Sequence, residues 1–293
     1  MVITDSLNKQ LFFKAGVFAA LVLMLMVSCK SSNETGNSPR ERLSLDKGWR
    51  FMKYDSEAAA DSLIYDVRPS LTDYNDSKDA DSKPTESLET EAKQMVLKPW
   101  ILPSGNAFIK DPANRHIRPE GNPGSDFAFV QYNFNDSAWQ EVNLPHDWAI
   151  KGPFLQGWNA ETGGGMGRLE SNGVAWYRRK LDISEADTSK SVFLEVDGAM
   201  SYAMVWLNGN LVGGWPYGYN SWQLDLTPYL NVGGENQLAI RIDNPPASSR
   251  WYPGGGIYRN VWLIKTNKVH VGQWGTYITT RNVSEKNATI DLK

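Results

Sequence analysis

Residues 191–198, SVFLEVDG, decide the fold class, because apolar and polar side chains alternate along them. An extended chain points successive side chains to opposite faces, so the apolar residues of this stretch share one face. The same alternation occurs in residues 237–243, QLAIRID. Such short runs, bounded by Gly, Pro, Asn and Asp and separated by no amphipathic helix, predict an all-β antiparallel sandwich.

Residues 203–215, AMVWLNGNLVGGW, predict a β-hairpin within this sandwich. Asn208 and Gly209 lie at its centre, and a type I′ turn requires two residues there that accept positive φ angles. Trp206 falls in the first predicted strand. A large aromatic side chain at such a position is more typical of a core than of a ligand-facing surface.

Charge and composition exclude several classes of partner. The net charge of -3 and the pI near 5.7 leave no basic surface of the kind that nucleic-acid binding requires. The three histidines, His116, His146 and His270, lack metal-ligand spacing. Two glycine triplets, residues 163–165 and 254–256, do not follow a strand and open a helix, so we interpret them as turns rather than nucleotide-binding loops. We therefore expect no metal and no cofactor.

The start of the chain has the features of an export signal. Lys9 and Lys14 precede an apolar run, residues 15–27, that is too short to span a bilayer as a permanent helix. The run ends in MVSC at residues 26–29, which resembles a bacterial lipoprotein lipobox. Cleavage before Cys29, the only cysteine, leaves that residue to carry a lipid. The alternative is an uncleaved leader with an incidental cysteine.

Segment boundaries follow from this interpretation and from local composition. We expect residues 1–28 to be a lipoprotein signal peptide and residues 29–42 to be a flexible polar tether. Residues 43–55, LSLDKGWRFMKYD, read as one opening strand, and a polar insertion occupies about residues 55–125. The protein is then an exported bacterial lipoprotein of the cell envelope, attached to the membrane through its lipid and facing the periplasm or the outer surface.

Four blocks of sequence resemble family 2 glycoside hydrolases. The first is DSAWQEVNLPHDW at residues 136–148, and the others follow in the family's order: AWYRR at 175–179, VWLNG at 205–209, and RWYPGGGIYRNVW at 250–262. The resemblance implies a galactose-binding-domain-like jelly roll over residues 43–266. Residues 267–293 then look like the truncated start of an immunoglobulin-like sandwich.

The resemblance also implies further domains and a class of reaction. In this family the jelly roll is followed by an immunoglobulin-like domain and a TIM barrel that carries two catalytic glutamates. A barrel needs roughly 250 residues, and retaining hydrolysis needs two carboxyl groups about 5 Å apart. The sequence offers no convincing pair, so we expect no catalytic residue here and no hydrolysis by this chain alone.

Two clusters are the candidates for sugar contacts, because aromatic faces stack on pyranose rings and short polar groups bind their hydroxyls. They are the predicted loop with His146, Asp147 and Trp148 and the segment with Arg250, Trp251 and Tyr252. Alternatives remain for each cluster: Asp147 caps a turn, Trp148 packs in a domain interface, and Arg250 forms an interdomain ion pair.

A third aromatic stretch has two interpretations. Trp215, Tyr217 and Tyr219 flank three glycines, so they form either a platform for a sugar or a lid over the hydrophobic core.

Two functions are compatible with these patterns, and the alternative to both is a truncated product with no independent role. The first is the amino-terminal sugar-binding part of a β-galactosidase-type enzyme, shaping the pocket of a neighbouring barrel for a β-galactoside or related glycan. The second is a carbohydrate-binding module, tethered to the envelope, without enzymatic activity. β-Glucuronidases and β-mannosidases share the architecture, so the sequence does not choose the glycoside.

Overall fold

The computed structural model describes residues 38–66, 94–103, 105–154, 169–245, 252 and 254–293. The chain divides into two units, Met1–Ser38 and Pro39–Lys293, and every element below belongs to the second. Cys29 and the rest of the predicted leader and tether up to residue 37 lie outside the described residues, as do Arg250, Trp251 and the glycine triplet at 163–165. Within the described part of the chain, no helix is both long enough and apolar enough to cross a membrane.

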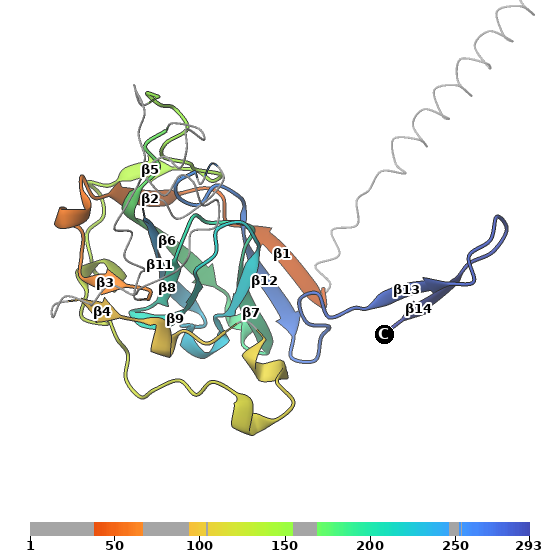
Figure 1. Cartoon of the computed structure of the whole chain (residues 1–293). Helices are drawn as coiled ribbons and strands as arrows, with labels where there is room; N and C mark the ends of the chain where they lie inside the picture. The colour runs from red at the N-terminus through yellow and green to blue at the C-terminus, as the bar shows by residue number, and fades with distance from the viewer. Residues whose placement is uncertain (1–37, 67–93, 104, 155–168, 246–251, 253) are drawn as a thin grey trace, which may run out of the picture. The chain divides into compact units, whose positions relative to one another are not determined.

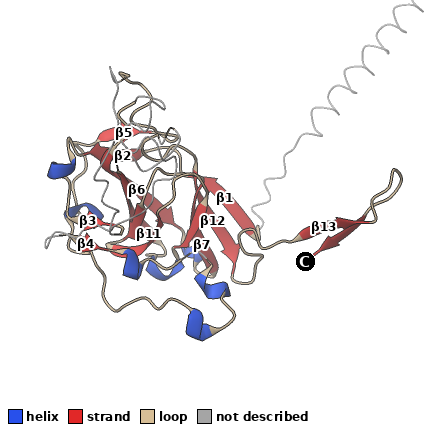
Figure 2. Cartoon of the chain, viewed as in Figure 1, coloured by secondary structure: helices blue, strands red, loops and turns tan. Residues whose placement is uncertain are grey.

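Two antiparallel sheets form the sandwich (Figures 1 and 2), which confirms the all-β prediction. The four-stranded sheet has the order β1 (Arg40–Ser44), β12 (Val261–Asn267), β7 (Lys190–Val196), β10 (Trp222–Asp225). The six-stranded sheet has the order β5 (Gln140–Val142), β2 (Trp49–Lys53), β6 (Gly173–Ile183), β11 (Gly234–Asn244), β8 (Ala203–Leu207), β9 (Asn210–Trp215).

The remaining elements are short. Strands β3 (Leu63–Ile64) and β4 (Met95–Val96) pair in parallel, and β13 (Ile278–Arg281) pairs with β14 (Thr289–Leu292). The helices are single 3-10 turns in the connections (Figure 2): η1 (Glu57–Ala59), η2 (Lys98–Trp100), η3 (Asn106–Phe108), η4 (Pro112–Asn114), η5 (Ala128–Val130), η7 (Glu185–Asp187) and η8 (Thr227–Tyr229).

The main core lies between the two sheets, where period-two alternation predicted it. On β7, buried and partly exposed residues alternate along the whole strand. The buried set joins the apolar face of β11 in one cluster with Val192, Leu194, Val196, Leu238, Ile240 and Ile242. Full burial of one such side chain contributes roughly 1.5–3 kcal/mol, so this shared face stabilises the sandwich.

The hairpin between β8 and β9 has the predicted turn. Asn208 and Gly209 adopt φ angles of 52° and 77°. The side-chain Nδ2 of Asn208 donates to Asn236 Oδ1 at 2.8 Å and to the carbonyl of Tyr229 at 2.9 Å. These bonds hold the turn against β11 and η8. Trp206 is fully buried, as expected for a core residue.

The opening segment is two strands rather than the single strand that the sequence suggested. β1 joins the four-stranded sheet and β2 the six-stranded sheet. Gly48, with φ of 77°, lets the chain turn between them. The carboxylate of Asp46 holds the turn against β12, because it accepts hydrogen bonds from the backbone N–H of Val261 at 2.9 Å and from Asn260 Nδ2 at 2.7 Å.

The described parts of the polar insertion add a third layer to the sandwich. They cover the outer face of the six-stranded sheet, which explains why β8 is buried at every position. The insertion and the segment after it provide Leu63, Tyr65, Leu97, Ile101 and Val130, and the sheet provides Trp176, Met204, Trp206, Leu211 and Ala239. A sheet covered on both faces loses the polar alternation of a solvent-facing one.

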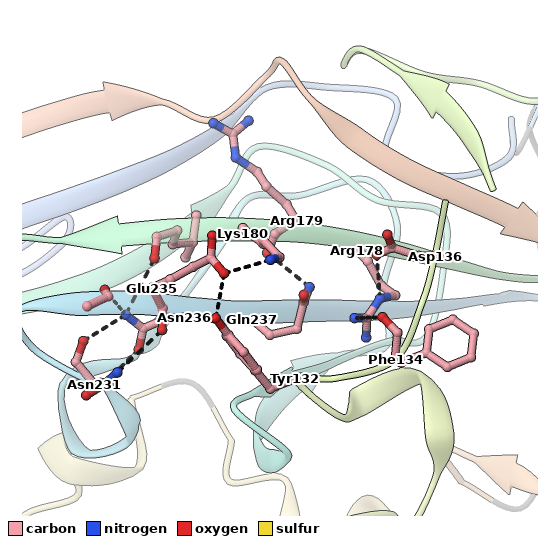
Figure 3. Close-up of polar contacts among 12 residues, drawn as sticks. Tyr132, Phe134, Asp136, Arg178, Arg179, Lys180, Asn231, Glu235, Asn236 and Gln237 are labelled. Atoms are coloured by element: carbon pink, nitrogen blue, oxygen red, sulfur yellow. Dashed lines mark hydrogen bonds and ion pairs between the residues drawn. The ribbon is translucent and has the colours of Figure 1, made fainter. Parts of the chain in front are cut away.

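Arg178 on β6 fixes the segment that follows the insertion (Figure 3). Its side chain is 1% exposed, and its Nε donates to Asp136 Oδ2 at 2.8 Å. The same guanidinium also donates to the backbone carbonyls of Phe129, Gln131 and Phe134. The Arg178 side chain therefore holds the loop that leads into β5 through several charge-assisted hydrogen bonds. Strand β5 is the edge strand beside the candidate site.

Candidate functional site

A hollow of about 790 Å³ lies beside the edge of the six-stranded sheet. Strands β2 and β5 form one side, and the loop of residues 143–153 forms the other. The lining mixes aromatic, amide and charged side chains, among them Phe51, Lys53, Gln140, His146 and Trp148. The first predicted cluster, His146, Asp147 and Trp148, thus lies at this hollow.

The backbone of residues 146–148 is held by the second glycine triplet. His146 N–H donates to the carbonyl of Ile257 at 2.8 Å, and Trp148 N–H donates to that of Gly255 at 3.0 Å. On its other side, Gly256 exchanges two backbone hydrogen bonds with Met200, at 2.9 and 3.2 Å. The triplet is therefore a bridge between two segments, whereas the sequence suggested a turn.

Close approach explains why these bridge positions are glycines. A Cβ on Gly255 lies 2.4 Å from the indole of Trp148, and one on Gly256 lies 2.2 Å from the hydroxyl of Tyr177. Gly256 also has a φ of 97°, which disfavours any side chain. Larger residues here displace the site segment.

Asp147 is engaged within the domain. Its Oδ1 accepts from the backbone N–H of Ala149 at 2.9 Å and of Gly255 at 3.0 Å. Its Oδ2 accepts from the hydroxyl of Tyr252 at 2.9 Å. The turn-capping alternative is therefore present in the structure, and the role of Asp147 as an acceptor for a sugar hydroxyl stays a prediction.

Trp148 packs between neighbours and keeps a partly exposed side at the hollow. Its ring stacks on Phe51 with centroids 6.1 Å apart, and Lys53 Nζ lies 5.9 Å from its centroid. The indole N–H donates to the carbonyl of Ser171 at 3.0 Å. That hydrogen bond uses the only polar atom of the ring, so the partly exposed surface of Trp148 at the hollow is carbon.

His146 combines burial with one strong hydrogen bond. Its Nδ1 lies 2.8 Å from the hydroxyl of Tyr177, and its ring meets Phe51 edge-on at 4.6 Å. Burial lowers the pKa of His146, partly offset by the nearby carboxylate of Asp147, and Lys151 lowers it further. The ring is therefore neutral at neutral pH.

Tyr252 connects the two predicted clusters, because its hydroxyl donates to Asp147. Its carbonyl also accepts from the hydroxyl of Tyr219, in the third aromatic stretch, at 3.2 Å. Burial and the hydrogen bond to Asp147 raise the pKa of Tyr252. Arg250 and Trp251, its predicted partners, lie outside the described residues.

The third aromatic stretch divides between the two interpretations. Trp215 packs against the main core, as a lid does. Tyr217 is 57% exposed and meets Tyr219 edge-on at 5.5 Å, so this pair lies at the surface. The hydroxyl of Tyr258 donates to the carbonyl of Gly218 at 2.8 Å and fixes the loop between the two tyrosines.

No metal-binding arrangement occurs among the residues that the structure describes: no three His, Cys, Asp or Glu side chains there are grouped to hold an ion.

Comparison with known proteins identifies the domain. Residues 168–253 match the family described as glycosyl hydrolase 2 galactose-binding domain-like. The chain is 47% identical over 170 residues to the β-galactosidase BoGH2A of Bacteroides ovatus. This chain carries the galactose-binding-like domain of family 2 glycoside hydrolases.

Other relatives of this galactose-binding-like domain belong to the same family. A β-glucuronidase of Formosa agariphila is 30% identical over 185 residues, or 55% of the chain. A solved family 2 member from Bacteroides cellulosilyticus aligns with 86% of the chain at a TM-score of 0.55 and 26% identity, and the alignment covers 24% of that structure. The matched part of BoGH2A is 58% of this chain but 20% of the relative, and for the β-glucuronidase it is 18% of the relative. The chain thus spans about a fifth of the length of these relatives.

Sequence reasoning missed the inner support of the galactose-binding-like domain's site. The sequence marks Tyr177 only as part of the family block at residues 175–179, and its contact with His146 spans 31 residues. The sequence predicts only a strand position for Phe51 and no contact with the site for Lys53. No local pattern marks Tyr177, because its full burial and its contact with His146 appear only in the folded domain.

Proposed function

We propose that these residues form the amino-terminal sugar-binding part of a family 2 glycosidase that acts on β-galactosides. The domain contributes substrate-positioning contacts to a neighbouring catalytic barrel rather than groups that break the glycosidic bond. The observation that carries the proposal is the 47% identity with a β-galactosidase, together with a hollow at the family's LPHDW segment.

The chemistry of the hollow supports a polyhydroxylated ligand. Trp148 and Phe51 supply apolar carbon surface, and Gln140, Asn143 and Lys53 supply donors. The Oδ1 of Asn143 accepts from Gly48 N–H at 3.1 Å, so we assign its Nδ2 as the donor to a ligand. Carboxylates line the same hollow and accept from sugar hydroxyls: Asp55, Glu141 and Glu170. Sugar sites combine such apolar faces with a few convergent polar groups.

Calorimetry with matched disaccharides tests this proposal. Lactose presents a terminal galactose. Cellobiose presents a terminal glucose, which differs from galactose only in the configuration at C4. We expect the chain to bind lactose with saturable heat and cellobiose more weakly. Equal heats for both sugars, or no heat at millimolar lactose, would contradict the assignment of a β-galactoside.

We also propose that Cys29 carries a lipid and anchors the protein to the bacterial envelope. The support is the apolar run of residues 15–27 followed by MVSC in a sequence with a single cysteine. Radiolabelled palmitate should be incorporated into the wild type and not into Cys29→Ala. Incorporation into the variant, or a wild type that stays in the soluble fraction, would contradict the anchor.

A further inference from the structure

Tyr177 places a hydroxyl in the wall that supports the hollow. Its side chain is fully buried at the centre of the core cluster, and its oxygen is 2.8 Å from His146 Nδ1. Among the described residues, this imidazole nitrogen is the hydrogen-bond partner recorded for the phenol.

Counting protons assigns the direction of the Tyr177–His146 hydrogen bond. A phenol has one proton, and among the described residues His146 Nδ1 is the only acceptor recorded for it. If Nδ1 carried a proton instead, the buried hydroxyl would lose its acceptor, and a buried donor without an acceptor is unfavourable. The arrangement with lower free energy has Tyr177 donating to an unprotonated Nδ1.

The other ring nitrogen then becomes the donor. A neutral imidazole carries its proton on one nitrogen, so an accepting Nδ1 leaves the proton on Nε2. Within the described part of the chain, no hydrogen bond of Nε2 is recorded, and His146 lines the hollow.

The imidazole is also held in place. The backbone N–H of His146 is bonded to Ile257, and Phe51 contacts the ring edge-on at an interplanar angle of 70°. Three independent contacts, with Phe51 of β2, Tyr177 of β6 and the Ile257 carbonyl, thus fix one orientation. A donor fixed in this way loses little entropy when a ligand binds.

We propose that Tyr177 is a positioning residue that fixes His146 as its Nε2–H tautomer, so that the hollow selects a glycan with an oxygen acceptor at that nitrogen. The identity of the ligand rests on the proposed sugar-binding function. The tautomer rests only on contacts inside this domain.

Long-range nitrogen-15 NMR of the imidazole rings tests the proposal, because it separates protonated from unprotonated ring nitrogens. The sequence has three histidines, and His146→Gln assigns the signal. We expect wild-type His146 to show the Nε2–H form and Tyr177→Phe to show a mixture of tautomers. Tyr65→Phe, which removes a hydroxyl from another buried tyrosine away from the hollow, is the matched control and should leave the signal unchanged.

Titration of the same samples with methyl β-galactoside separates this inference from the proposed function. We expect Tyr177→Phe to weaken binding by about 3- to 10-fold, the range for one net hydrogen bond, with Tyr65→Phe unaffected. An Nδ1–H form in the wild type, or a tautomer unchanged in Tyr177→Phe, overturns the positioning role. If the tautomers are as expected but methyl β-galactoside does not bind, the proposed sugar ligand is contradicted. The role of Tyr177 in positioning His146 then still stands.

Discussion

The guanidinium of Arg241 on β11 lies 2.9 Å from the carboxylate of Asp61, a residue 180 positions earlier in the chain. Both side chains are almost completely buried, with exposures of 1% and 2%. Asp61 also accepts from the indole N–H of Trp176 at 2.9 Å, and Arg241 reaches Asp243 at 3.1 Å. This buried network fastens the start of the insertion to the centre of the six-stranded sheet.

Asp61→Ala should therefore destabilise the domain strongly. Removal of one partner leaves the Arg241 cation buried without its main counterion, which typically costs about 3–5 kcal/mol. Glu235→Gln is the control, because the side chains of the Lys180–Glu235 pair are 57% and 33% exposed and such surface pairs contribute little to stability. Urea denaturation measures both. Equal losses in the two variants would show that Asp61 does not fasten the insertion.

The glycine bridge gives a prediction with a matched control. Gly256→Ala and Gly121→Ala both put a Cβ at a similar positive φ, 97° and 101°. A Cβ on Gly256 meets the Tyr177 hydroxyl at 2.2 Å, and one on Gly121 has no neighbour within 4 Å. We expect the Gly256 variant to lose about 1–3 kcal/mol more in free energy of unfolding, the typical cost of overpacking. Similar denaturation midpoints would refute the close packing of Gly256 on Tyr177.

Local patterns predicted the sandwich well, and long-range contacts account for what they missed. The alternation on β7 and the Asn208–Gly209 turn depend on neighbouring residues, so the sequence displays them directly. The layer formed by the insertion depends on Asp61 meeting Arg241 across the fold, and in sequence Asp61 is one acidic residue in a polar stretch. The division of the opening segment into two strands likewise depends on Asp46 contacting Val261.

The candidate site shows the same division. The family block marks His146, Asp147 and Trp148 as candidates for sugar contacts, and in the structure all three line the hollow. Their supports, Tyr177 and the glycine bridge, come from distant strands and loops, and no local pattern connects them to the hollow.

The lowered pKa of His146 predicts a dependence of stability on pH. Its folded-state pKa lies below the ordinary value of 6.5, so the unfolded state binds more protons between the two values. This contribution to stability is complete above pH 6.5 and is lost as the pH falls through 6.5 towards the folded-state pKa. His146→Gln should remove that loss, and His116→Gln, at an exposed position, should not. Unfolding free energies measured across about pH 5–7.5 give the comparison; superimposable wild-type and His146→Gln profiles would oppose it.

Asp147 and Tyr252 allow a direct contact to be separated from an internal one. Asp147→Asn keeps the shape of the side chain but loses its charge, and a charged hydrogen bond to a sugar hydroxyl is worth about 1.5–3 kcal/mol, or roughly 10- to 100-fold in affinity. Tyr252→Phe keeps the ring and removes only the hydroxyl that Asp147 accepts. NMR titration with methyl β-galactoside should show a large loss of affinity for Asp147→Asn and a small loss for Tyr252→Phe. Equal losses would assign Asp147 to holding the Tyr252 loop alone.

The central claim is that the hollow beside β5 binds a β-galactoside through His146 and Trp148. Nitrogen-15 NMR of the whole chain, titrated with methyl β-galactoside, tests it most directly. The account predicts saturable shifts of the Trp148 indole and His146 imidazole signals at about millimolar sugar. It also predicts that the Trp148 shift disappears in His146→Ala. Signals that stay unmoved at saturating sugar, or a Trp148 shift that persists in the variant, would contradict the claim.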